Sequence, residues 1–159
     1  MKIRIAGLVE ESYVDGEGIR FAIFMQGCLR NCKGCHNPET HDLNGGKIID
    51  TSEIIAKIKK NPLLTGITLT GGEPLLQIAP AVELARAAKN LGLDVWLYTG
   101  YKIEEILNDA QELLKFVDVV VDGEFIEELR DLDLKFRGSK NQRIIYLNEM
   151  LNDGALRNF

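Results

Sequence analysis

The sequence lacks the features that mark several common classes of protein. Cysteine occurs only three times in 159 residues, and no stretch approaches the roughly 18 apolar residues of a membrane span. Residues 1–5 include two charges where a signal peptide has its apolar run. An odd number of cysteines without an export signal argues against disulfides and predicts a reducing, cytoplasmic location.

Basic charge is also scarce, with 19 Lys and Arg against 24 Asp and Glu and a net charge of −5. No basic stripe is visible, so binding to nucleic acid is not expected. The composition is 45% hydrophobic and 27% charged, without low-complexity runs or repeats, as in an ordinary globular protein. The length predicts a single domain over residues 1–159.

The three cysteines lie close together, as Cys28, Cys32 and Cys35 in the spacing C-x3-C-x2-C. Three thiolates are one too few for a closed four-coordinate site, so a 4Fe–4S cluster held here keeps one iron open to a substrate or cofactor. A zinc site that adds His36 or His41 is the first alternative, and inert buried thiols are the second. We favour the cluster because zinc sites usually separate their ligands into two knuckles, and because the loop is polar.

Apolar strand-like runs alternate with amphipathic stretches along the chain, which predicts a parallel sheet covered by helices. Asp50 and Thr51 resemble N-cap residues. The chain is too short for an eight-fold barrel of about 250 residues. We therefore predict an α/β fold, a partial (open) β/α barrel with a mainly parallel sheet. Strands are expected at 19–26, 66–70, 93–98, 117–121 and 143–147, and helices at 51–60, 80–91 and 103–114.

Four polar or glycine-rich loops follow predicted strands: 28–35, 71–74, 98–101 and 122–123. The carboxyl ends of parallel strands meet at one edge of a sheet, so these loops are expected to converge there. Alone, Gly71-Gly72-Glu73-Pro74 is typical of a strand-to-helix turn. Here, however, the tetrapeptide follows the next predicted strand after the cysteine loop. This position suggests that its glycines leave bare backbone against a ligand and that Glu73 presents a carboxylate to a cation.

Other polar and aromatic residues have simpler interpretations. Trp96 alternates with apolar neighbours and is expected in the core. Arg137 and Arg143 fit either a solvated surface or a contact with an anion. Glu104 and Glu105 are expected on a solvated helix face.

The cysteine triplet followed by Gly-Gly-Glu-Pro resembles the radical S-adenosylmethionine superfamily. The segments 14–20, 35–38 and 45–46 are similar to those of enzymes that activate glycyl-radical proteins. Within that group, the chain resembles one family in particular, the activating proteins of anaerobic ribonucleoside-triphosphate reductase. The segments that carry this last resemblance are 98–101, 121–125 and 137–143.

The resemblance implies roles for individual residues. Cys28, Cys32 and Cys35 would hold a 4Fe–4S cluster whose open iron chelates the methionine part of S-adenosylmethionine. Many members have an aromatic residue before the third cysteine, where this chain has Gly34, so any stacking on adenine must come from elsewhere. The remaining implied contacts are Gly71, Gly72 and Glu73 with the ammonium, Gly34, Cys35 and His36 along the adenine, and Thr99 and Gly100 near the ribose.

The resemblance also implies the reaction. Reductive cleavage of S-adenosylmethionine would give a 5′-deoxyadenosyl radical that abstracts a hydrogen from a glycine of the large subunit of the reductase. Because no acid–base pair is required, no separate catalytic residue is predicted. The expected electron donor is a flavodoxin or ferredoxin. Because so short a chain has little material for a lid, we expect the glycine loop of the partner to close the radical site. The alternatives are another small radical S-adenosylmethionine enzyme with a different partner, and a non-catalytic iron–sulfur electron carrier.

Overall fold

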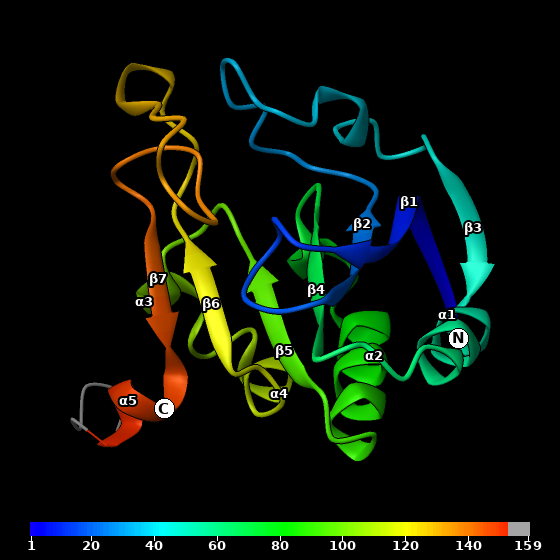
Figure 1. Ribbon diagram of the computed structural model, residues 1–159. Coiled ribbons are helices and arrows are strands. Elements are labelled where there is room, and N and C mark those ends of the chain that lie inside the picture. Colours follow the sequence, from blue (N-terminus) through cyan, green and yellow to red (C-terminus); the bar gives the residue numbers. More distant parts are fainter. Residues whose placement is uncertain (153–159) are drawn as a thin grey trace.

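The computed structural model describes residues 1–152, which form one seven-stranded sheet in the order β3-β1-β2-β4-β5-β6-β7 (Figure 1). The four central strands run parallel, and the strands at both edges are antiparallel to their neighbours. The edge strands β3 and β7 are not paired with each other, so the sheet is open. The predicted open, mainly parallel α/β fold is confirmed. The strands are β1 (Lys2–Ser12), β2 (Arg20–Met25), β3 (Lys47–Asp50), β4 (Gly66–Gly71), β5 (Asp94–Tyr98), β6 (Val119–Asp122) and β7 (Arg143–Tyr146).

The main apolar core lies between the sheet and the helices. Alternate strand residues such as Ile23, Leu69 and Leu97 pack in one cluster with Ile54 and Leu84 of the helices. The α-helices are α1 (Thr51–Lys60), α2 (Ile78–Asn90), α3 (Ile103–Ile106), α4 (Gln111–Leu114) and α5 (Leu147–Asn152), and the 3₁₀ turns are η1 (Pro38–Thr40), η2 (Pro74–Gln77) and η3 (Glu127–Leu129). In the described part of the chain, no helix has the length and apolar character needed to cross a membrane.

Local signals predicted the ends of α1 well and those of the later helices less well. The Asp50 carboxylate accepts the Ser52 N–H at 3.0 Å as the N-cap of α1, and this bond lowers the pKa of Asp50 to about 2. Helix α2 begins at Ile78, two residues before the predicted Pro80, and stops where Gly92 has a φ of +77°. The single helix predicted over 103–114 was wrong, because α3 and α4 are separate short helices there.

Two strands, β1 and the edge strand β3, were not predicted. In β1, Ile3 and Ile5 are fully buried while Lys2 is exposed, the alternation typical of a strand with one face on the core. Strand β3 begins directly after Gly46, where a Cβ atom would collide with the Ile5 carbonyl of β1. Bare backbone at this position therefore lets β3 approach β1.

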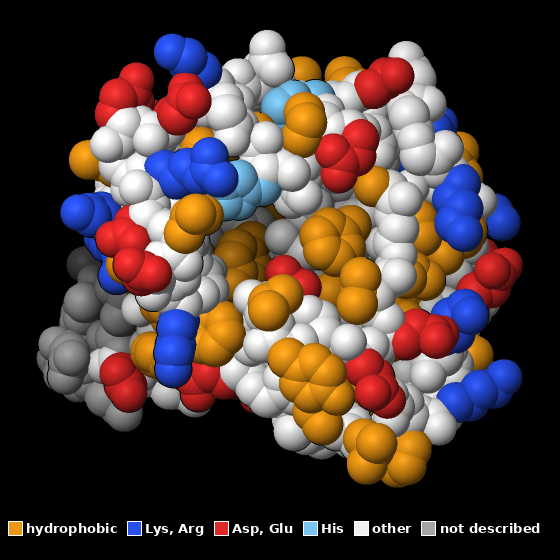
Figure 2. Space-filling model, turned by 45° about the horizontal axis from the view of Figure 1, so that its top comes forward, with side chains coloured by type: hydrophobic (Ala, Val, Ile, Leu, Met, Phe, Trp, Pro, Cys, Tyr) orange, Lys and Arg blue, Asp and Glu red, His pale blue; other side chains and the backbone are white. Residues whose placement is uncertain are grey.

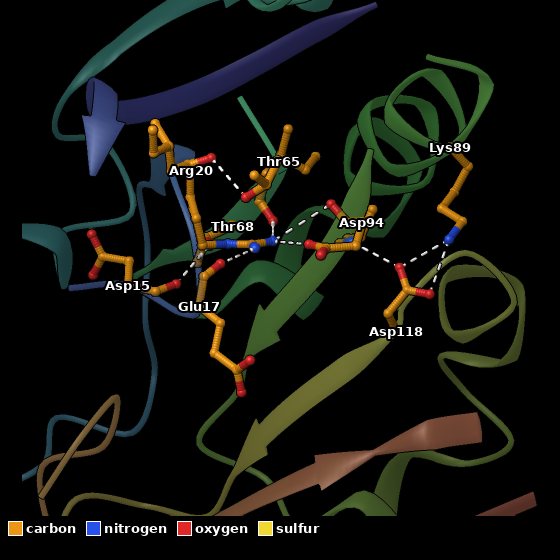
Figure 3. A network of polar contacts seen from close by, with 11 residues as sticks. Asp15, Glu17, Arg20, Thr65, Thr68, Lys89, Asp94 and Asp118 are labelled. Atoms are coloured by element: carbon orange, nitrogen blue, oxygen red, sulfur yellow. Dashed lines mark hydrogen bonds and ion pairs between the residues drawn. The ribbon is translucent and has the colours of Figure 1, made fainter. Parts of the chain in front are cut away.

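On the sheet face away from the main core, Arg20 joins three parallel strands (Figure 3). The side chain is completely buried, and its Nε donates to Thr68 Oγ1 of β4 at 2.8 Å. Its Nη2 donates to the Ile67 carbonyl at 2.6 Å and pairs with Asp94 Oδ1 of β5 at 2.5 Å. Gly66 makes room for this contact, because a Cβ atom there would lie 2.5 Å from Arg20 Nη2.

Trp96 lies in the core, as predicted, but on this same second face. It is 2% exposed and packs with Val119 and Val121 in a separate cluster. The Arg20 guanidinium lies 5.4 Å from its ring centroid, and Phe136 packs against it edge-on at 5.4 Å. The sheet face away from the main core therefore combines a buried cation with aromatic packing.

We expect Asp94→Asn to lower the free energy of unfolding by roughly 1–3 kcal/mol, because it removes the charge that compensates the buried guanidinium. The measurement is urea denaturation. As a control, Glu112→Gln removes a carboxylate from exposed pairs with Lys115 and Arg86 and should change stability by less than about 0.5 kcal/mol. Equal effects of the two substitutions would contradict the role given to Asp94.

Candidate cofactor site

A cavity of about 960 Å³ opens at the carboxyl ends of the parallel strands. Figure 2 shows a hollow on this face with hydrophobic side chains around it. The predicted convergence of four loops is confirmed, since each contributes to the lining. The lining includes Cys28, Cys32, Cys35 and His36 after β2, Thr70, Gly71, Gly72 and Glu73 at the end of β4, Tyr98, Thr99 and Gly100 at the end of β5, and Gly123 after β6.

The cysteine loop is fixed at its base by backbone hydrogen bonds. Gly27 N–H donates to the Thr40 carbonyl at 2.7 Å, and Cys28 N–H donates to the His41 carbonyl at 3.2 Å. Within the loop, Cys35 N–H donates to the Cys32 carbonyl at 3.2 Å. The three cysteines are half-buried and free of disulfides. Their thiols are therefore held at the cavity wall while staying open to it.

Three free cysteines at one cavity wall are a donor set that fits an iron–sulfur cluster. Burial raises the pKa of the Cys35 thiol; the Asn37 N–H opposes this rise, and the nearby Cys32 and Cys28 add to it. Within residues 1–152, no three His, Cys, Asp or Glu side chains converge as ligands of one metal ion. A cubic cluster spreads its cysteines over separate iron atoms, whereas zinc requires all ligands around one centre.

The turn after β4 lies directly on the start of the cysteine loop. Gly72 N–H donates to the Met25 carbonyl at 2.7 Å, and Glu73 N–H donates to the Gly27 carbonyl at 2.8 Å. A Cβ atom on Gly72 would collide with the Gly27 carbonyl and lie 3.0 Å from that of Thr40. The presence of glycine at position 72 is therefore explained without any ligand, because the two backbone segments pass too closely for a side chain.

Glu73 joins the loops after β4 and β5. Its side chain is 3% exposed; Oε1 accepts the Thr99 hydroxyl at 2.8 Å and Oε2 accepts the Gly100 N–H at 2.8 Å. Leu75 N–H donates to Oε1 at 3.3 Å. Burial raises the pKa of Glu73, and these hydrogen bonds together with the charge of Arg30 oppose the rise. The structure thus brings Glu73, Thr99 and Gly100 together.

Gly34 and His36 lie beside the connection between β6 and β7, residues 123–142. A Cβ atom on Gly34 would lie 3.1 Å from the Glu127 side chain, and the His36 ring packs on Phe125 with centroids 4.9 Å apart. This connection forms a wall of the cavity that sequence analysis missed. Its lining residues include Phe125, Leu132, Leu134, Phe136 and Arg137. The only signals for it were the family-like segments at 121–125 and 137–143.

Arg143 pairs with carboxylates of the chain itself. The two interpretations from the sequence, a solvated surface residue or a contact for a bound anion, were therefore incomplete. It forms ion pairs with Asp122 of β6 and with Glu104 of α3, the latter at 2.7 Å, and these partners raise its pKa. Glu104 is correspondingly an ion-pair partner rather than only a solvated residue. Asp122 also accepts the Ile103 N–H at 2.9 Å. Arg143 therefore fixes β7 and the start of α3 to β6.

Tyr98 adds a polar group that sequence analysis assigned to no role. Its hydroxyl is buried and has no hydrogen-bond partner in the described part of the chain, and the residue lines the cavity beside Thr70. Buried polar groups are nearly always paired. Tyr98 therefore brings a buried phenol group to the wall of the cavity.

We expect Gly72→Ala to lower the free energy of unfolding by roughly 1–3 kcal/mol, because the added methyl group forces the turn away from the cysteine loop. Urea denaturation measures the change. Gly7→Ala is the matched control, since a Cβ atom on Gly7 meets nothing within 4 Å. A Gly72 variant as stable as the Gly7 variant would contradict the close approach described here.

Comparison with known proteins identifies the family. Residues 14–145 match the model of a 4Fe-4S single cluster domain. The chain is 37% identical over 139 residues to an anaerobic ribonucleoside-triphosphate reductase-activating protein of Vibrio cholerae, covering 82% of this chain and 90% of that one. Its counterpart in Haemophilus influenzae is 35% identical with the same coverage. That of Enterobacteria phage T4 is 37% identical over 83% of this chain and 86% of its own.

Among solved structures, QueE from Escherichia coli aligns with 63% of this chain and 53% of its own, with a TM-score of 0.48 and 20% identity, which is too distant to bear on function. The sequence relatives are similar over nearly their whole length, and all three have the same name. That name agrees with a cavity lined by both the cysteine loop and the Gly-Gly-Glu-Pro turn. The chain belongs to the family of anaerobic ribonucleoside-triphosphate reductase-activating proteins.

Proposed function

We propose that this chain activates an anaerobic ribonucleoside-triphosphate reductase by forming a glycyl radical on its large subunit, using a 4Fe–4S cluster and S-adenosylmethionine. The observation that carries the proposal is that three half-buried cysteines and the Glu73 turn line the same cavity in a member of this family. Cys28, Cys32 and Cys35 would hold the cluster. With only three cysteines, one iron remains for S-adenosylmethionine.

Glu73 is suited to hold the ammonium group of S-adenosylmethionine. An ionised carboxylate has about four acceptor sites, and Thr99, Gly100 and Leu75 occupy three of them. The remaining site accepts an ammonium donor, whose charge favours the ionised form that burial disfavours. Gly71 and Gly72 are the other proposed contacts of the ammonium, through their backbone, since a Cβ atom on either would meet the backbone of β2 or of the cysteine loop.

The other proposed contacts follow from their places in the cavity. Thr99 and Gly100 would lie near the ribose while holding Glu73 in place, and the segment Gly34, Cys35 and His36 would lie along the adenine. The bound cofactors would supply a one-electron cleavage that yields a carbon radical able to abstract hydrogen. The chain's own residues would position them and exclude water from the radical.

The mouth of the cavity is suited to a folded partner. Tyr13, Val14 and Leu132 line the cavity and are 63%, 75% and 79% exposed. Exposed apolar side chains around a cavity are typical of an interaction site, so we propose that the glycine loop of the reductase enters here. We further propose a flavodoxin or ferredoxin as electron donor and the cytoplasm as location.

The direct test is anaerobic reconstitution with iron and sulfide, followed by dithionite and S-adenosylmethionine, with 5′-deoxyadenosine measured against a control without reductant. We expect product that depends on the cluster. A cluster that reduces and reoxidises without consuming S-adenosylmethionine, even with the reductase present, would indicate an electron carrier instead. A colourless protein that retains zinc would make the cysteines structural.

We expect Cys32→Ala to abolish formation of 5′-deoxyadenosine while retaining the fold, because two cysteines cannot hold the cluster in an active form. Circular dichroism and iron analysis accompany the assay. The matched control is Leu29→Ala, which changes an exposed residue of the same loop. Full activity of the Cys32 variant would exclude it as an essential ligand.

We expect Glu73→Gln to weaken the affinity for S-adenosylmethionine by at least about tenfold, because a neutral amide loses the charge-assisted bond to the ammonium. Equilibrium binding to the reconstituted protein measures it, and the iron content should not change. Glu112→Gln, at an exposed acidic residue of α4 outside the cavity lining, serves as control. Unchanged affinity of the Glu73 variant would leave this residue with a role in the turn alone.

A further inference from the structure

Arg30 lies between two of the three cysteines, but its side chain reaches away from the cysteine loop. The guanidinium carbon is 4.3 Å from the centroid of the Tyr101 ring, after β5. Its Nη2 is 3.8 Å from Glu105 Oε2, and its Nη1 is 3.5 Å from Glu124 Oε2, after β6. Only 24% of the side chain is exposed. One residue of the cysteine loop therefore contacts the loops that follow two other strands.

The backbone of Gly100 separates Arg30 from Glu73. A Cβ atom on Gly100 would lie 2.5 Å from Arg30 Cδ, 2.9 Å from Arg30 Nε and 3.5 Å from Glu73 Oε2. The Gly100 N–H donates to that same Glu73 oxygen at 2.8 Å. A side chain at position 100 would displace the arginine stem, which packs directly on the backbone that holds Glu73.

The buried Nε of Arg30 has no hydrogen-bond partner in the part of the chain that the structure describes. Burial of such a donor is unfavourable, so the stacking on Tyr101 and the two carboxylates must hold the side chain in this position. The positive charge also favours the ionised form of Glu73. Packing and charge therefore both connect Arg30 to the Glu73 site.

No other side chain of residues 28–35 forms a hydrogen bond or ion pair with residues 99–105 in the described structure. Lys33, the other cation of the loop, lies 3.7 Å from Glu127 and is 84% exposed. It contacts the β6–β7 connection instead. Arg30 is therefore the side-chain link between the cysteine loop and the end of β5.

We propose that Arg30 is a positioning residue that fixes the cysteine loop relative to the Glu73–Gly100 pair. The inference rests on the proposed function, in which one ligand must reach both the open iron and Glu73. Such a ligand binds well only if these two anchors are held at a fixed separation, since small misplacements are costly in a preorganised site. Without Arg30, each anchor would remain but their relative position would vary.

The first experiment uses the full chain without cluster and measures amide hydrogen exchange in Arg30→Met, Arg30→Lys and Lys33→Met. In Arg30→Met we expect exchange to be about fivefold faster or more both in residues 28–35 and in residues 99–105, because the two loops no longer support each other. Arg30→Lys keeps the charge without the planar stacking and should be intermediate. Lys33→Met, the matched loss of charge, should leave residues 99–105 unchanged.

The second experiment measures equilibrium binding of S-adenosylmethionine to the reconstituted variants. We expect Arg30→Met to weaken binding by about tenfold at an unchanged iron content, with partial recovery in Arg30→Lys. Unchanged exchange in residues 99–105, or unchanged affinity at full iron content, would overturn the role of Arg30. If the unsubstituted protein bound no S-adenosylmethionine while the exchange result held, the proposed function would fail and the contact between the loops would stand.

Discussion

The buried guanidinium of Arg20 is the interaction on which the arrangement of the central strands depends. It reaches from β2 across Gly66 of β4 to Asp94 of β5, and it donates to Thr68 on the way. A buried ion pair is weak evidence for stability, because desolvation offsets much of its attraction, but it penalises any other strand register. Three strands fixed in register at one end deliver their following loops to common positions at the other.

At the opposite end, the residues expected to bind a cofactor also hold the protein together. Gly72 allows the turn after β4 to lie on the cysteine loop, and the Glu73 carboxylate joins that turn to Thr99 and Gly100. Arg30 packs on the other side of Gly100. The site is therefore preorganised by contacts within the chain, which reduces the entropy lost when a ligand binds.

Features determined by neighbouring residues were predictable, and features determined by distant pairs were not. The central strands, the Asp50 cap and the convergence of the loops follow from local patterns and from the rule for parallel sheets. The antiparallel strands β1 and β3, the ion pairs of Arg143 and the cavity wall from 123–142 depend on partners far along the chain. The break between α3 and α4 was hidden by an apolar period that continues across it.

The central claim is that this chain forms a glycyl radical on its reductase, and electron paramagnetic resonance tests it most directly. The reconstituted protein is incubated anaerobically with dithionite, S-adenosylmethionine and the purified reductase, with the Cys32→Ala variant as control. The account predicts a carbon-centred doublet, split by the one hydrogen left on the glycine α-carbon, that is absent with the variant. S-adenosylmethionine cleavage without any radical on the reductase would contradict it.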